Sequence, residues 1–183
     1  MSVLLDHRGD WTIEDYRRLP EDDTRYELYD GSLLVNPTPV YRHQSVAFRL
    51  AQSLDAAAPP DIAVVLSVDV VVPAGVFIPD VLALPRDIAE RLEHEFPARE
   101  VLLVVEVESP TGRRRDRVLK QNAYAEAGIP SYWRVELRDA AAPVVVQELR
   151  DGVYVETARL EPGVRGRIDR PFALELDPAE LLS

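Results

Sequence analysis

The run from Val101 to Glu108 is the most apolar in the sequence and constrains the fold more than any other segment. A continuous apolar run without alternation is typical of a strand covered on both faces. A helix is predicted next, over Arg113 to Ala127, closed by Gly128 and Pro130. A further strand, Ser131 to Leu137, completes a strand-helix-strand crossover. The sequence therefore predicts an α/β fold.

Two Asp-Gly pairs predict tight β-hairpins on either side of this crossover. Asp30-Gly31 lies between the short runs of Arg25 to Val35, and Asp151-Gly152 lies between the β-rich segments of Pro143 to Val155. Strand alternation in the first hairpin sets Glu27 on the face opposite to Tyr26. The expected architecture is a mixed central β-sheet with flanking helices and β-hairpins.

The remaining segments give weaker local signals. We expect a helix over about 12–19 with Thr12 as its N-cap, a helix with His43 in its first turn that ends before Pro59-Pro60, two strands over 62–72 and 76–84 joined by Pro73-Ala74-Gly75, and an exposed helix over 86–95. The tail from 161 to 183 is expected to pack without regular structure. No linker or repeat interrupts residues 1–183, which predicts a single domain.

Composition limits the possible functions. The chain of 183 residues has no cysteine, which excludes disulfides and thiolate zinc sites. No apolar run approaches the roughly 20 residues of a membrane span, and residues 1–10 lack the layout of a signal peptide, so a cytoplasmic protein without membrane association is expected. The net charge of −11 argues against a protein that holds nucleic acid mainly by a large basic surface.

Four acidic residues lie within apolar strands, where an unpaired carboxylate is costly. They are Asp69, Asp80, Glu106 and Glu108. Glu106 and Glu108 are two residues apart, so they share one face at the end of the central strand, where sites in α/β sheets form. Catalysis or metal binding is favoured for Glu106 over a structural pair with an arginine. For Glu108 a functional role and simple exposure are balanced, and Asp69 is interpreted as structural or exposed.

Lys120 is the only lysine among 21 basic residues. One interpretation is an exposed pair with Asp116, worth a few tenths of a kcal/mol. The other is a compact ammonium that acts at a phosphate or at a metal-bound water, a role that arginine does not reproduce. The neighbouring carboxylates favour the second interpretation.

The chain contains an ordered set of motifs: Arg25-Tyr26-Glu27-Leu28-Tyr29-Asp30-Gly31, His43-Gln44, Pro79-Asp80, Val104-Val105-Glu106-Val107-Glu108-Ser109-Pro110, Lys120, and Tyr124-Ala125-Glu126-Ala127-Gly128-Ile129-Pro130-Ser131-Tyr132-Trp133. Together these motifs resemble the Uma-type restriction endonuclease family of the PD-(D/E)xK nuclease superfamily. They span almost the whole chain, from about Trp11 to Tyr154. The resemblance implies a restriction-endonuclease-like core and a divalent-metal nuclease that uses Mg²⁺ or Mn²⁺.

The resemblance also implies residue roles. Asp80 and Glu106 match the metal ligands, and Lys120 matches a lysine that the family carries on the next helix rather than on the strand. Glu27 matches an N-terminal acid that completes the cluster, and His43 matches a histidine near the site. Glu108 occupies the usual lysine position of the superfamily, where it either adds a metal ligand or adds excess charge.

The densest basic stretch lies at the start of the helix that carries Lys120. Arginine there opposes the helix macrodipole, so helix stability does not explain it. We hypothesise a contact with the phosphate backbone, and a solvated face that pairs with acids elsewhere is an equal alternative. The residues concerned are Arg113, Arg114, Arg115 and Arg117.

Three functions compete at this stage. The leading hypothesis is a nuclease that hydrolyses phosphodiester bonds, with DNA as its nucleic-acid partner and a homodimer as its assembly. The second is a catalytically inactive nuclease-fold module that binds without cutting. The third, a sugar hydrolase using Glu106 and Glu108, ranks last because two carboxylates at one strand end are poorly placed to flank a ring.

Overall fold

The computed structural model describes residues 9–20, 24–92, 94–108 and 114–182, without the side chains of 114–117. Two β-sheets and a small hairpin account for the described strands. The larger sheet has the order β11-β10-β9-β8-β6-β3, with β3 Ile62–Leu66, β6 Val81–Pro85, β8 Leu103–Glu108, β9 Ser131–Glu136, β10 Val144–Arg150 and β11 Val153–Leu160. The second has the order β2-β1-β5-β4-β7, with β1 Arg25–Tyr29, β2 Ser32–Asn36, β4 Asp69–Val72, β5 Gly75–Phe77 and β7 Glu95–Pro97.

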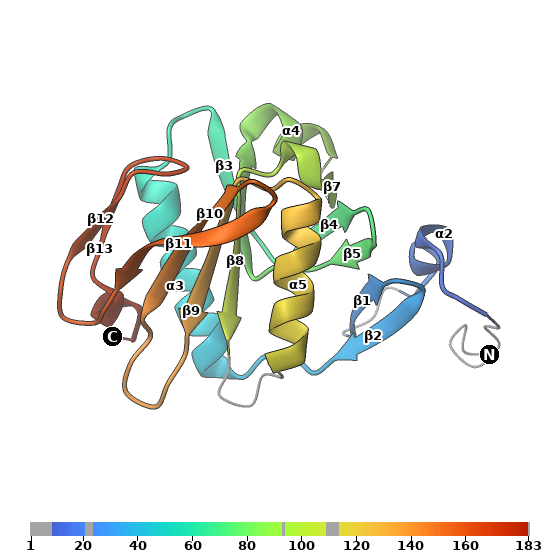
Figure 1. Ribbon diagram of the computed structural model, residues 1–183, viewed down its shortest axis with the longest axis horizontal. Coiled ribbons are helices and arrows are strands. Elements are labelled where there is room, and N and C mark those ends of the chain that lie inside the picture. The colour runs from blue at the N-terminus through green and yellow to red at the C-terminus, as the bar shows by residue number, and fades with distance from the viewer. Residues whose placement is uncertain (1–8, 21–23, 93, 109–113, 183) are drawn as a thin grey trace.

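Strand β8 lies inside the larger sheet, as its apolar sequence predicts. It pairs in parallel with β9 and antiparallel with β6. The crossover between β8 and β9 contains α5 (Arg114–Glu126), and the opposite face of the sheet is covered by α3 (Tyr41–Ala57). Figure 1 shows α5 in front of this sheet and α3 behind it. The predicted α/β fold with a mixed sheet is confirmed.

The two faces of β8 build two separate cores because successive side chains alternate. Leu103 and Val105 pack with α3, whereas Val104 packs with Tyr124 of α5. Glu106 has the same parity as Val104, so its side chain points toward α5. The buried acid predicted from the sequence is therefore carried to the helix that contains Lys120.

The two predicted Asp-Gly hairpins are present. Strands β1 and β2 pair antiparallel around Asp30-Gly31, where both residues have positive φ, and β10 and β11 pair around Asp151-Gly152 in the same way. Helices α2 (Ile13–Tyr16) and α4 (Arg86–Leu92) are shorter than expected, although Thr12 does form the predicted N-cap of α2.

The predicted turn at Pro73-Ala74-Gly75 is confirmed, but the prediction of two unbroken strands over 62–72 and 76–84 is wrong. The chain forms four strands there, because it leaves the larger sheet after β3, makes the β4–β5 hairpin in the second sheet, and returns as β6. Ser67, with φ of 51°, lies at the first break, and the second break contains Asp80. Asp80 thus lies where the chain passes from one sheet to the other.

The tail is more regular than expected. Strands β12 (Gly166–Ile168) and β13 (Leu174–Leu176) form an antiparallel hairpin, and a 3-10 helix, η2 (Pro178–Leu182), follows. A second 3-10 helix, η1 (Ala98–Glu100), precedes β8. Leu174, Leu176 and Leu181 pack into the core beneath α3, so the tail helps to hold that helix against the sheet. Among the described residues, no helix is long and apolar enough to cross a lipid bilayer.

Candidate active site

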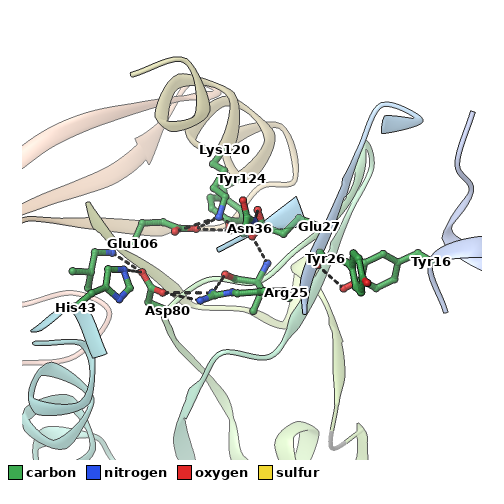
Figure 2. Close-up of polar contacts among 12 residues, drawn as sticks. Tyr16, Arg25, Tyr26, Glu27, Asn36, His43, Asp80, Glu106, Lys120 and Tyr124 are labelled. Carbon is green, nitrogen blue, oxygen red and sulfur yellow. Dashed lines mark hydrogen bonds and ion pairs between the residues drawn. The ribbon is translucent and has the colours of Figure 1, made fainter. Parts of the chain in front are cut away.

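Lys120 lies between two carboxylates that come from different sheets (Figure 2). Its Nζ is 2.7 Å from Glu27 Oε1 and 3.2 Å from Glu106 Oε1, and its side chain is 17% exposed. Burial lowers the pKa of Lys120, but the charges of Glu106 and Glu27 outweigh it and raise the pKa above its usual value. The lysine is therefore a fixed cation that is largely buried and not exposed as one interpretation expected, and the side chain of Asp116, its partner in that interpretation, lies outside the described side chains.

Glu106 accepts hydrogen bonds from one face of α5. Its Oε1 accepts from Tyr124 Oη at 2.9 Å, and Tyr124 is one helical turn after Lys120. Burial raises the pKa of Glu106 to about 7; Lys120 opposes the shift, and the negative charges of Asp80 and Glu27 add to it. The carboxyl group is consequently balanced between its two protonation states near neutral pH.

Glu27 is 2% exposed, and both of its oxygens are hydrogen-bonded. Besides Lys120, Oε1 accepts from the backbone N–H of Ile78 at 2.9 Å, and Oε2 accepts from Asn36 Nδ2 at 2.8 Å. Asn36 ends β2 and Ile78 follows β5, so the second sheet and its hairpin fix the orientation of Glu27. This satisfies a buried carboxylate that would otherwise be costly.

Asp80 has a separate set of partners. Its Oδ2 accepts from the Val107 N–H at 2.8 Å and lies 3.3 Å from His43 Nε2, while its Oδ1 lies 3.4 Å from Arg25 Nη2. Burial tends to raise the pKa of Asp80, but His43, Arg25 and the Val107 N–H together lower it. Burial likewise tends to lower the pKa of His43, and Asp80 raises it overall. Asp80 is therefore an ionised aspartate that favours protonated His43.

The strand register brings Asp80 and Glu106 together. Val81 is the partner of Val105, so continuing the antiparallel register by one residue sets Asp80 opposite Glu106. Side chains that are directly opposite on one face have Cβ atoms about 4.5–5.5 Å apart. The loss of regular strand geometry at Asp80 turns its carboxylate toward His43 at the start of α3, as Figure 2 shows.

The structure thus brings together five of the predicted site residues: Glu27, His43, Asp80, Glu106 and Lys120. It places Glu108 elsewhere. The Glu108 carboxylate lies 3.2 Å from Arg134 Nη1, on the neighbouring strand β9. Glu106 and Glu108 share a face as predicted but contact different cations, and Glu108 as a metal ligand stays a prediction.

Asp69 takes part in none of the contacts described for Lys120 and Asp80. It lies in β4, where its backbone neighbour in the parallel strand β7 is Glu95.

The arginines predicted to contact phosphate fall outside the described side chains. Arg113 lies outside the described residues, and so do the side chains of Arg114, Arg115 and Arg117, whose backbone belongs to α5. Their predicted role stays a prediction.

Three residues of the site were not predicted: Arg25, Asn36 and Tyr124. Strand alternation, helical spacing and hairpin register, all of which can be read from the sequence, would have placed each of them near the site. Arg25 is two residues before Glu27 on the same strand face, and Tyr124 is four residues after Lys120 on one helix face. Asn36 is the partner of Arg25 in the hairpin register, which the Asp30-Gly31 turn sets.

The donors of the site suit a hard divalent cation. Asp80, Glu106 and Glu27 offer carboxylate oxygens, the ligands that Mg²⁺ and Mn²⁺ prefer. Their negative charge is balanced in the structure by Lys120, Arg25 and His43. Within the described ranges, no group of three or more acidic or histidine side chains is spaced as a preformed metal cage. The donor chemistry therefore fits such an ion, with the protein's own cations as the present counter-charges.

Comparisons with known proteins agree on the fold. A crystal structure from Anabaena variabilis, described as a putative nuclease belonging to DUF820, superimposes with a TM-score of 0.74 at 17% sequence identity, over 94% of this chain and 97% of that one. The restriction-endonuclease-like fold predicted from the motifs is thereby confirmed. No curated protein matches the chain. The family model Uma2, described as "Putative restriction endonuclease", matches residues 13–179, and the chain therefore belongs to the Uma2 family.

Proposed function

We propose that the protein is a divalent-metal-dependent endonuclease that hydrolyses phosphodiester bonds in DNA. The observation that carries the proposal is the buried position of Lys120 between Glu27 and Glu106, next to the pair of Asp80 and His43. Two carboxylates from different sheets share this one buried ammonium, and a third carboxylate lies beside them with its own cations, an arrangement that is costly for a purely structural role. The family description and the nuclease description of the Anabaena protein support the same reaction.

In this proposal Asp80 and Glu106 hold the ion, with Glu27 as a further candidate ligand. A bound divalent ion polarises a phosphoryl oxygen and lowers the pKa of water. Lys120 supplies a positive charge that stabilises negative charge developing at the phosphate. Glu27 and Tyr124 position the two groups, since Glu27 bonds Lys120 and Tyr124 bonds Glu106. We assign to His43, held by Asp80, the exchange of a proton with the substrate.

A catalytically inactive module of the same fold is the second candidate. Its support is that every carboxylate of the cluster already has a cation or hydrogen-bond donor in the described structure, without a preformed cage. Action as a cytoplasmic homodimer also stays a prediction.

The test is cleavage of supercoiled plasmid DNA in Mg²⁺ or Mn²⁺ by the wild type, Asp80→Asn and Lys120→Arg. Asp61→Asn, at an exposed position, is the matched control. Lys120→Arg should lose about 10²–10³-fold in cleavage rate, because the wider guanidinium does not fit between the two carboxylates. Calorimetry should show that this variant still binds Mn²⁺. Asp80→Asn should lose both cleavage and Mn²⁺ binding. Equal cleavage by all four proteins would remove the assignment, and DNA binding without any cleavage would favour the inactive module.

A further inference from the structure

A cleft of about 590 Å³ adjoins Asp80 on the side of α3. Arg25, His43 and Asp80 line one part of it, so a molecule in the cleft contacts the polar side of the candidate site. The cleft also meets the first turn of α3, whose N-cap residue Val40 makes no side-chain capping hydrogen bond. Backbone N–H groups at such a terminus attract phosphate.

Another part of the cleft is apolar and open to solvent. Phe48 lines it and is 53% exposed, and Leu66 lines it and is 40% exposed. Gln44 precedes Phe48 by one helical turn on α3 and lines the cleft as well. A concave site with exposed apolar side chains and a few polar groups is the usual form of a small-ligand pocket.

This combination matches the chemistry of one nucleotide. Arg25 and the first-turn N–H groups of α3 suit a phosphate, the ring of Phe48 suits the flat face of a base, and the amide of Gln44 can donate to and accept from a base edge. In a duplex the faces of a base are covered by its neighbours, so an aromatic side chain reaches a base face only where the base is unstacked. The net charge of −11 points the same way, because it leaves little scope for a broad grip on duplex phosphates.

We propose that this cleft binds an unpaired nucleotide of the substrate strand, with its base against Phe48 and Leu66 and its phosphate toward Arg25 and His43. The inference rests on the proposed function for the identity of the strand as DNA. It adds that the substrate is single-stranded, or is unpaired next to the bond that is cut.

The test is fluorescence anisotropy with a 5′-fluorescein-labelled ten-residue oligothymidylate, alone and as a duplex with oligoadenylate. EDTA is present, so binding is measured without cleavage. The variants are Phe48→Ala and Phe48→Trp, with Val153→Ala as a matched control because Val153 is an exposed apolar residue on β11, outside the cleft. Circular dichroism checks that each variant is folded.

The wild type should bind the single strand more tightly than the duplex. Phe48→Ala should weaken that binding about tenfold, and Phe48→Trp should retain it within about twofold because indole also stacks on bases. Val153→Ala should bind as the wild type does. No binding by the wild type, equal binding by Phe48→Ala, or a preference for the duplex would each overturn the inference.

The cleavage assay, run on plasmid and on single-stranded circular DNA, and the anisotropy assay separate the two proposals. Single-strand binding that depends on Phe48, from a protein that never cuts DNA, would leave the cleft assignment standing and remove the nuclease. Cleavage that depends on Lys120, with no effect of Phe48→Ala on single-strand binding, would do the reverse.

Discussion

Replacing Glu106 by glutamine should change how the stability of the folded protein depends on pH. Burial raises the pKa of Glu106 from 4.5 to about 7, even though Lys120 opposes the shift. The folded protein therefore binds this proton more tightly than the unfolded chain does. The contribution of Glu106 to stability is complete below about pH 4.5 and is lost as the pH rises through 7. The difference between a pKa of 4.5 and one of about 7 corresponds to about 3 kcal/mol.

The assay is urea unfolding in EDTA at pH 4.5, 6.0 and 7.5, followed by circular dichroism. The quantity to compare is the free energy of unfolding of Glu106→Gln minus that of the wild type. This difference should be about 3 kcal/mol larger at pH 7.5 than at pH 4.5, because the wild type loses the contribution of Glu106 as the pH rises. In thermal melts this corresponds to about 6–12 °C for a chain of this size. Glu126→Gln is the control, since Glu126 is exposed near the end of the helix that carries Lys120. Its difference from the wild type should stay constant within about 0.5 kcal/mol.

Two results would refute the reasoning. A difference that stays constant from pH 4.5 to 7.5 would mean that Lys120 fully compensates the burial of Glu106, whose side chain is 14% exposed. A difference that falls with pH would mean that the ammonium dominates and that the pKa of Glu106 is lowered.

Two further substitutions test the geometry around the site. Tyr124→Phe removes the hydroxyl that donates to Glu106, so it should lower stability by about 1 kcal/mol and raise the pKa of Glu106 further, as a carboxyl titration by NMR would show. Gly75→Ala should destabilise the protein by more than about 2 kcal/mol in urea unfolding, because its φ is 148° and a Cβ there would lie 2.1 Å from the Leu28 carbonyl oxygen. Gly128→Ala, where φ is 79° and a Cβ meets open space, should cost only about 1 kcal/mol, and equal losses at the two glycines would contradict the steric argument.

Local signals predicted the parts of the fold that depend on neighbouring residues. The apolar run of β8 and the two Asp-Gly turns specify their structures within a few residues, so they were predicted correctly. The breaks at Ser67 and Asp80 were not, because neither residue is a glycine and both segments are β-rich throughout. The sheet to which each strand belongs is decided by pairing partners distant in sequence.

The same distinction holds for the candidate site. Burial of charge in apolar strands selected Asp80 and Glu106, the count of a single lysine selected Lys120, and family resemblance added Glu27 and His43. The pairing of Glu108 with Arg134 could not be predicted, because it depends on the parallel register of β8 with β9, which no local motif sets.

The ion pair of Glu27 with Lys120 joins residues 93 positions apart in the chain, and the hydrogen bond of Glu27 with Ile78 spans 51. During synthesis the ribosome releases Glu27 long before the helix that contains Lys120 exists. Contacts of such large separation form late, because the cost of closing the intervening loops comes first. The cluster consequently cannot assemble on a nascent chain before α5 has been synthesised and has packed against both sheets.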